Sequence, residues 1–420
     1  MLLPYLKIAW KVLLRRKFFT AISLFGISFT LMILLVAVAM ADHVAGAHAP
    51  EKRVDRLLFV NALREQMRNG GNNTMPVSEY FIDRYMRPMK TPALVALTTP
   101  TASATSFANS HSLTLDVRYT DGNFWLLTDF EFLDGRAFTG REVKAAERVC
   151  VVNEHTARAF FGASRGVAGR AVEIGPHRYR IVGVVPNVPG IRFLSSADVW
   201  MPYTLNPNYF RDQRLNGDFI PILLAPTKEA VPAVQAEFQQ VMRRVEIPNP
   251  KEVKRLLAYA DPLLASLTRA LMGSLDASED NGVASFLLIC TVLGLFFMLL
   301  PALNLVNLNV TRILERSSEI GVRKAFGASA GTLVGQFLVE NLVLVSLGAL
   351  LGLALAAGAL HLLNESRVFA YAQFGLDWRA FGWGVGLAAL FGLLSGVYPA
   401  WKMARLSPVD ALRASGGGPQ

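Results

Sequence analysis

Four long apolar segments constrain the fold of this chain more than any other feature of its sequence. The first, residues 18–40, contains 23 residues without a charge. As an α-helix it would extend about 35 Å at about 1.5 Å per residue, and the hydrocarbon core of a bilayer is about 30 Å thick. We therefore predict four transmembrane helices, at residues 18–41, 283–306, 330–363 and 380–400.

The composition indicates that only part of the chain lies in a membrane. Hydrophobic residues make up 52% of the 420 residues and charged residues 18%, which is more apolar than a typical soluble protein. The segment between the first two predicted helices, residues 42–282, has an ordinary soluble composition. We therefore expect a membrane α-helical fold with a large soluble domain inserted after its first helix.

Residue patterns predict that this inserted domain is of the α+β class. Residues 113–119 alternate apolar and polar side chains, as a half-buried strand does, and residues 179–185 indicate a more buried strand. Apolar residues recur at helical spacing in 229–246. Segments rich in Gly, Asn or Pro predict loops at 69–73 and 186–190.

The distribution of charge predicts how the chain is oriented. Segments 1–17, 307–329 and 401–420 together hold twelve Lys and Arg against three acidic residues, and these segments carry nearly all of the net charge of +10. Basic residues flanking transmembrane helices favour the cytoplasmic side. We therefore predict that both termini are cytoplasmic, and that domain 42–282 and the short loop 364–379 lie outside the cytoplasm.

Residues 1–17 have the pattern of an amphipathic helix lying on the inner leaflet, and they fit a simple basic flank equally well. Ala39-Met40-Ala41 resembles a signal-peptide cleavage site, but the apolar run before it is longer than the usual 7–15 residues. We therefore favour a retained helix. Because the basic excess lies beside membrane segments, we expect contact with membrane lipids and no nucleic-acid partner.

The motifs that would indicate catalysis or metal binding are weak in this sequence. Cys150 and Cys290 are too few for a disulfide framework, and the six histidines lack metal-ligand spacing. No phosphate-binding G-x-x-x-x-G-K-[ST] motif occurs, so any ATP-driven work needs a partner. Residues 327–331 fit G-x-S-x-G, but no strand is expected before Ser329, which we predict to cap the third transmembrane helix. We therefore expect no catalytic residue, metal or cofactor in this chain.

A charged segment between the second and third helices is the strongest candidate for docking a soluble partner. Its charges fall at helical spacings that allow pairing, and glycines permit a close approach. A solvated basic loop is the alternative. The residues concerned are Glu315, Arg316, Glu319, Ile320, Gly321, Arg323, Lys324 and Gly327.

Gln336 and Glu340 lie one turn apart in the third predicted helix. Polar groups are costly against lipid, so we expect both to face another helix, a polar cavity or the membrane interface. A purely structural role for Glu340 is the alternative. Glycines of the third and fourth helices permit close helix packing; they are Gly348, Gly352, Gly358, Gly382, Gly384 and Gly386.

Two C-terminal motifs resemble a known family. The stretch Glu315-Arg316-x-x-Glu319-Ile320-Gly321-x-Arg323-Lys324-Ala325-x-Gly327-Ala328, followed by Gln336-Phe337-Leu338-x-Glu340, is similar to the FtsX-type permease domain of ABC transporters. The ending, residues 396–413, resembles the second signature of that domain, and its matching positions include Pro399, Ala404, Leu406, Pro408, Leu412 and Arg413. An FtsX-like permease domain is therefore expected at residues 283–413.

The inserted domain resembles the MacB-like periplasmic domain. The similarity lies in Val152-Asn153-Glu154, in the 179–185 strand and in Asp198-Val199-Trp200-Met201-Pro202-Tyr203. MacB carries a fused ATPase before its first helix, whereas 17 residues precede Phe18 here, so the sequence resembles a separate permease subunit. FtsX itself has a much smaller outer domain, which makes a role in cell division less favoured.

This resemblance implies that the chain pairs with a second permease, identical or not, and with a dimeric ATPase that binds ATP and Mg. It also implies that segment 307–329 receives the motion of the ATPase and that the periplasmic domain moves in response. A periplasmic adaptor is a further candidate partner. The implied cargo is a peptide, antibiotic, lipoprotein or lipid-like molecule that is exported or extracted.

Two other functional classes are compatible with the sequence. A transmembrane signal transmitter, which controls an envelope enzyme or senses antimicrobial peptides, would use the same architecture. A membrane-anchored extracytoplasmic enzyme would show activity in the isolated 42–282 fragment, but no catalytic constellation supports it.

Overall fold

The computed structural model describes residues 11, 13–15, 17–108, 111–272, 280–315, 322, 326, 329–366, 368–369 and 371–404. The chain divides into two compact units, each described by itself below. The helical unit consists of Met1–Asp42, Leu288–Val368 and Gln373–Gln420. The α/β unit consists of His43–Leu287 and Phe369–Ala372.

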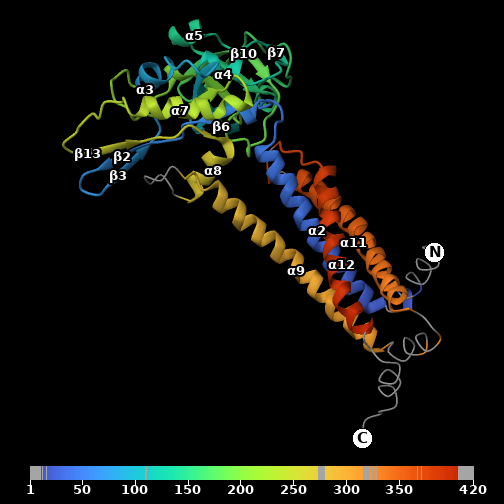
Figure 1. Cartoon of the computed structure of the whole chain (residues 1–420). Coiled ribbons are helices and arrows are strands. Elements are labelled where there is room, and N and C mark those ends of the chain that lie inside the picture. Colours follow the sequence, from blue (N-terminus) through green and yellow to red (C-terminus); the bar gives the residue numbers. More distant parts are fainter. Residues whose placement is uncertain are drawn as a thin grey trace. The chain divides into compact units, whose positions relative to one another are not determined.

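Long apolar helices dominate the helical unit (Figure 1). They are α2 (Lys17–Ala45), α9 (Val283–Glu315), α11 (Ala330–Ser366) and α12 (Trp378–Ala404). Among the described residues, α2 and the Val334–Ser366 part of α11 are long and apolar enough to cross a membrane. The apolar parts of the other two, Val283–Leu299 and Trp378–Leu394, are shorter.

Helices α2, α11 and α12 pack through small and branched side chains, and α11 and α12 lie side by side (Figure 1). A Cβ on Gly348 would lie 2.7 Å from Ile27 Cγ2, and one on Gly392 would lie 2.6 Å from Val345 Cγ2. Glycine is therefore required at these two crossings. The predicted close packing is confirmed for Gly348, Gly352 and Gly384. A Cβ added at Gly358, Gly382 or Gly386 would meet no neighbouring atom within 4 Å among the described residues, so close packing at these three stays a prediction.

An 11-stranded mixed sheet forms the centre of the α/β unit, in the order β14-β1-β12-β4-β6-β11-β8-β10-β7, with β5 beside β6 and β9 beside β10. β6 pairs parallel with β11, and β8 pairs parallel with β10. The strands are β1 (Leu57–Phe59), β4 (Leu94–Thr98), β5 (Ala102–Ala108), β6 (His111–Thr120), β7 (Asp134–Gly135), β8 (Val149–Asn153), β9 (Ala171–Ile174), β10 (His177–Val185), β11 (Val199–Pro202), β12 (Ile220–Leu224) and β14 (Asp261–Pro262).

A second, three-stranded antiparallel sheet has the order β13-β2-β3 and extends from the rest of this unit as an arm (Figure 1). Its strands are β2 (Leu63–Met67), β3 (Asn72–Met75) and β13 (Val253–Leu257). The helices of the unit are α3 (Glu79–Phe81), α4 (Gly122–Leu127), α5 (Gly140–Lys144), α6 (Glu154–Phe161), α7 (Val231–Met242) and α8 (Leu263–Met272). Short helical turns are η1 (Val54–Arg56), η2 (Ile82–Met86), η3 (Tyr203–Leu205) and η4 (Lys228–Ala230).

Both faces of the main sheet are covered. Successive side chains of a strand point to opposite faces, and in β8 Val149 and Val151 belong to one buried cluster whereas Cys150 and Val152 belong to the other. The first cluster also contains Phe238 of α7, together with residues of α3, η2 and α4. The second is smaller and includes α6.

Most local predictions for the α/β unit are confirmed. The strands expected at 113–119 and 179–185 are β6 and β10, and the helix expected within 229–246 is α7. The loop expected at 69–73 is shorter, because Asn72 and Asn73 lie in β3 and pair with β2. Gly70 has a φ of 89°, which allows a turn tight enough for the strand to begin early.

Candidate functional site

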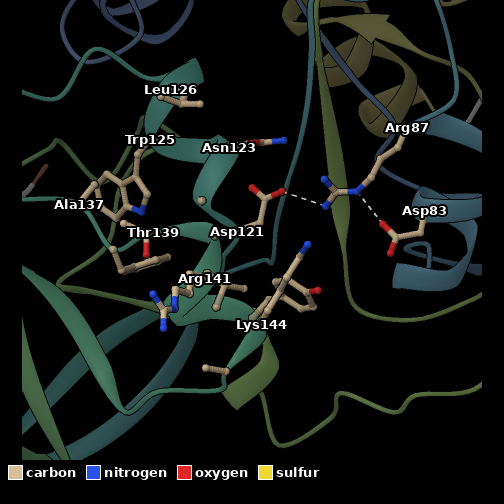
Figure 2. A pocket seen from close by; sticks show the side chains of 16 residues that line it. Asp83, Arg87, Asp121, Asn123, Trp125, Leu126, Ala137, Thr139, Arg141 and Lys144 are labelled. Atoms are coloured by element: carbon tan, nitrogen blue, oxygen red, sulfur yellow. Dashed lines mark hydrogen bonds and ion pairs between the residues drawn. The ribbon is translucent and has the colours of Figure 1, made fainter.

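The α/β unit contains an open cleft of about 990 Å³ (Figure 2). Its apolar lining includes Trp125, Phe138 and Val143. Polar and charged side chains surround this apolar surface; they are Asp83, Arg87, Asp121, Asn123, Thr139, Arg141, Lys144 and Tyr203. Helices α4 and α5 supply half of the lining residues.

Two helix starts meet at the cleft. Asp121 follows β6 and caps α4 by accepting the Phe124 N–H at 3.0 Å. Thr139 caps α5 in a capping box with Glu142. A Cβ on Gly122 would lie 2.7 Å from Gly140 N, so the two helix starts can approach this closely only because residue 122 is glycine.

A chain of alternating charges forms one wall of the cleft, as Figure 2 shows. Arg87 Nη2 donates to Asp121 Oδ2 at 3.1 Å, and Arg87 Nε donates to Asp83 Oδ1 at 2.6 Å. Burial raises the pKa of Asp121 to about 6, against the opposing effects of Arg87 and of the Leu97 and Phe124 N–H groups. Burial lowers the pKa of Arg87, but the two carboxylates outweigh it and the net pKa is raised.

Positive side chains outnumber negative ones beside α5, in contrast to the wall where Arg87 lies between two carboxylates. Arg136 binds both Glu142 oxygens, at 2.8 and 2.9 Å, and this hydrogen bonding lowers the pKa of Glu142 to about 2. Arg141 and Lys144 of α5 line the cleft (Figure 2). The cleft therefore offers an apolar surface with charges of both signs, which suits binding of an amphipathic molecule or protein segment.

The described residues contain no group of three or more His, Cys, Asp or Glu that could hold a metal ion. Ser329 Oγ accepts the Thr332 N–H at 3.2 Å directly before α11 begins at Ala330. The predicted cap is confirmed, because the hydroxyl satisfies a free N–H of the first turn. Cys150 is fully buried, and burial raises the pKa of its thiol.

The structure brings Gln336 and Glu340 together inside the helical unit. Gln336 Nε2 donates to Glu340 Oε1 at 3.3 Å, and the two side chains are buried. Their burial agrees with the cost of exposing polar groups to lipid. Asn341, which was not singled out from the sequence, is also buried.

The described residues include few of the other predicted site residues. Glu315 is the last residue of α9, α12 contains Pro399, and Ala404 is the last residue of α12. The remaining members lie outside the described residues, as does most of segment 1–17; they are Arg316, Glu319, Ile320, Gly321, Arg323, Lys324, Gly327, Leu406, Pro408, Leu412 and Arg413.

Sequence reasoning did not find the cleft. Two local signals were available, Asp121-Gly122 after an alternating strand and Thr139-Gly140-Arg141-Glu142 as a capping box. Each predicts a helix start. Neither predicts that the two helix starts meet.

The described residues thus form one unit of long apolar helices, two of which are long and apolar enough to cross a membrane, and one mixed α/β unit. Residues 20–241 match the family model of the MacB-like periplasmic core domain, and residues 291–408 match that of the FtsX-like permease C-terminal. The chain therefore belongs to the family of ABC transporter permeases that carry a MacB-like and an FtsX-like domain. The resemblance drawn from the sequence motifs is confirmed.

Curated relatives agree with this assignment. An uncharacterized ABC transporter permease, YknZ of Bacillus subtilis, is 25% identical over 66% of this chain and 65% of its own length. The macrolide export ATP-binding/permease protein MacB of Escherichia coli is 24% identical over 97% of this chain and 60% of its own length. The chain thus spans less than two thirds of the length of either relative.

Solved structures of extracytoplasmic domains also resemble part of this chain. The extracellular domain of the noncanonic ABC-type transporter YknZ from Gram-positive bacteria is 13% identical, with a TM-score of 0.35, over 47% of this chain and 98% of that domain. At this TM-score the family assignment rests on the sequence matches alone.

Proposed function

We propose that this chain is the transmembrane subunit of an ATP-driven ABC transporter that couples a separate cytoplasmic ATPase to movement of its periplasmic domain. The observation that carries the proposal is the order of its domains, a MacB-like core followed by an FtsX-like permease. In this proposal α2, α9, α11 and α12 cross the bacterial inner membrane, both termini are cytoplasmic, and the α/β unit is periplasmic.

The surface of the helices supports a membrane environment. Large apolar side chains are exposed along all four, for example Phe25 at 65%, Leu288 at 64%, Leu350 at 62% and Trp383 at 78%. Soluble monomers rarely expose apolar patches this extensive. Lipid or a second copy of the permease would cover them.

The interior of the helical unit supports transmission of motion without a hydrophilic pathway through the membrane. Gln336 and Glu340 bond to each other and are buried. A pathway for polar cargo would need more intramembrane polar groups along it. The proposed mechanism is that ATP binding moves segment 307–329, and α2 and α9 carry the movement to the α/β unit.

The cargo would then be handled on the periplasmic side. The cleft beside Asp121 and Lys144 has apolar and charged surfaces, so it is our candidate contact for a peptide, antibiotic, lipoprotein or lipid-like cargo, or for an adaptor. A second permease subunit and a dimeric ATPase complete the proposed assembly.

The experiment uses a double charge reversal, Arg323→Glu with Lys324→Glu. We expect loss of permease-stimulated ATPase activity in the purified complex, because the reversed charges would repel the ATPase surface that the native pair binds. Membrane insertion should be unchanged. The matched control reverses two exposed residues of the α/β unit, Lys251→Glu with Lys254→Glu, and should keep the stimulation. Full stimulation in the Arg323/Lys324 variant would remove the docking role.

A further inference from the structure

Buried arginines hold the two segments through which the α/β unit continues into α2 and α9. Arg269 of α8 is 6% exposed, and its Nε donates to Asp261 Oδ2 at 2.6 Å. Its Nη2 donates to the other oxygen of the same carboxylate at 3.3 Å. Its guanidinium carbon lies 3.9 Å from the centre of the Tyr259 ring. These contacts fix the plane of the guanidinium from two sides.

Arg269 also bonds to the segment that precedes α9. Its Nη1 donates to the Asp280 carbonyl at 3.2 Å, and the neighbouring Thr268 Oγ1 donates to the Asn281 carbonyl at 2.8 Å. Gly282, with a φ of 74°, then turns the chain, and α9 begins at Val283. The segment directly before α9 is thereby bonded to α8 and, through Asp261, to strand β14.

Arg192 makes the corresponding contacts at the end of α2, which finishes at Ala45. Arg192 Nη2 donates to the Gly46 carbonyl at 3.2 Å, and Nη1 donates to Glu51 Oε2 at 3.3 Å. Ser195 Oγ donates to the second Glu51 oxygen. The Arg192 and Glu51 side chains are only 1% and 2% exposed, so water does not compete for these bonds.

The contacts of Arg192 continue into the main sheet. Arg118 of β6 donates to the Phe193 carbonyl at 2.8 Å and to the Ser196 carbonyl at 3.2 Å. Burial lowers the pKa of Arg118 to about 10, against the attraction of Glu51. Three residues further along the chain, Asp121 forms the charged wall of the cleft. Hydrogen bonds and short stretches of chain thus link the end of α2 to the cleft.

Stability alone does not account for these two ion pairs. Replacing a buried ion pair with apolar residues of similar volume is often neutral or stabilising, because desolvation offsets the attraction between the charges. We take these pairs to fix a defined geometry. Each arginine also donates from a further Nη group to a backbone carbonyl where the α/β unit meets a long helix, at Gly46 after α2 and at Asp280 before α9. We call these two places the Arg192 junction and the Arg269 junction. The two junctions also enter adjacent strands, because β1 follows the Arg192 junction and pairs with β14.

We propose that Arg192 and Arg269 are positioning residues that fasten α2 and α9 to the main sheet, so that movement of the two helices reaches the cleft. This inference rests on the proposed function. Arg269 bonds to the edge of the sheet at β14, whereas Arg192 lies in the loop before β11 and bonds to the segment that follows α2. A relative displacement of the two helices would therefore strain the strands that lie between these points and change the cleft.

The experiment measures ATP-dependent opening of the cleft in the full chain, purified with its own ATPase and placed in lipid nanodiscs. A Leu126→Cys substitution introduces a thiol at a cleft residue that is 65% exposed, with Cys290 replaced by Ala and buried Cys150 retained. The probe is a water-soluble maleimide. We expect the labelling rate to change several-fold with ATP, and we expect that ratio to fall to one in Arg192→Gln and in Arg269→Gln with basal ATPase activity unchanged.

Two further variants separate positioning from loss of folding. Arg269→Lys keeps the positive charge beside Asp261 but lacks the planar fork, so it should fold and still lose the ATP-dependent change. Ile181→Ala creates a cavity in the second buried cluster, which contains none of the residues that bond to Arg192 or Arg269, and should keep the change despite its lower stability.

Each outcome is decisive. If the Leu126→Cys parent shows no ATP-dependent change, both the proposed function and this inference are overturned. If the parent responds and the arginine variants respond equally, the fastening role is overturned and the proposed function stands. A loss of response in Ile181→Ala would assign the effect to general destabilisation and would also overturn the fastening role.

Discussion

The α/β unit and the helical unit differ in how far they expose their large apolar side chains. In the α/β unit Trp200 and Phe238 are fully buried, as in a typical water-soluble core. In α2 the polar Ser23 and Ser28 are buried at 2% and 1% exposure, whereas Phe25 between them is 65% exposed. Large aromatic side chains are therefore buried in the α/β unit, whereas α2 exposes one and buries small polar side chains beside it.

This difference shows that different forces hold the two units together. Burial of apolar surface away from water drives the folding of the α/β unit. Where the surroundings are apolar, that force is absent, and helices associate through close approach of small residues and through polar contacts. The glycine crossings at Gly348 and Gly392 and the Gln336–Glu340 bond are interactions of this second kind.

The largest expected effect tests the comparison directly by making the same substitution in both units. Phe238→Ala should lower the free energy of unfolding of the α/β unit by about 3–5 kcal/mol, because it leaves a cavity in the first buried cluster. Phe25→Ala should cost less than about 0.5 kcal/mol, because an exposed side chain leaves no cavity. Denaturant unfolding of the full chain in detergent measures both. Similar costs would show that Phe25 is packed against a protein partner.

An intermediate effect is expected at the helix crossings. Gly348→Ala should destabilise the helical unit by about 1–3 kcal/mol, because the new methyl group would lie 2.7 Å from Ile27 Cγ2 and would push α2 away from α11. Thermal loss of the helical circular dichroism signal in detergent provides the measurement. The matched control in the same helix is Gly358→Ala, where an added Cβ would meet no neighbouring atom within 4 Å in the part of the chain that the structure describes. It should stabilise by about 0.5–1 kcal/mol, and equal destabilisation by both changes would contradict the assigned crossing.

The smallest expected effect concerns pH and is confined to the α/β unit. Hydrogen bonding to Arg136 lowers the pKa of Glu142 to about 2, so the ionised form stabilises the fold above the ordinary pKa of 4.5, and this contribution is lost as pH falls toward 2. Because the Arg136 side chain is 56% exposed, solvent reduces the contribution to about 1–2 kcal/mol.

Glu142→Gln should therefore remove this acid-dependent loss, which unfolding of the full chain between pH 5 and pH 2 would measure. The control is Glu154→Gln, which breaks an exposed pair with Arg158. Its effect should be below about 0.5 kcal/mol at every pH. If the two variants have the same acid dependence, Arg136 does not stabilise ionised Glu142.

The parts of the fold that were predictable have local patterns. The alternation in 113–119 identifies β6, and the helical spacing in 229–246 identifies α7, because burial of one face imposes a period on the sequence. Ser329 was predictable as a cap because a hydroxyl at a helix start has one main role. Gly358, Gly382 and Gly386 were not separable from the packed glycines, because only the neighbouring helix determines what a Cβ would meet.

The cleft and the arginine contacts could not be predicted in this way. Arg87 and Asp121 are 34 positions apart, and Glu51 and Arg192 are 141 apart. No periodicity relates residues at these separations. Whether the two residues of each pair come into contact depends on the order in which the strands pair in the sheet.

The sequence by itself determined that this chain has long apolar helices, a large mixed α and β insertion, and the motifs of an FtsX-like and a MacB-like domain. These are properties of short segments, set by hydrophobic period and by the residues within each motif. Only the tertiary structure decided that β1 lies beside β14, that two helix starts form a cleft, and that Arg192 and Arg269 hold the ends of α2 and α9. The physical reason is that buried charges must find partners wherever the folded chain brings them, whatever their distance in sequence.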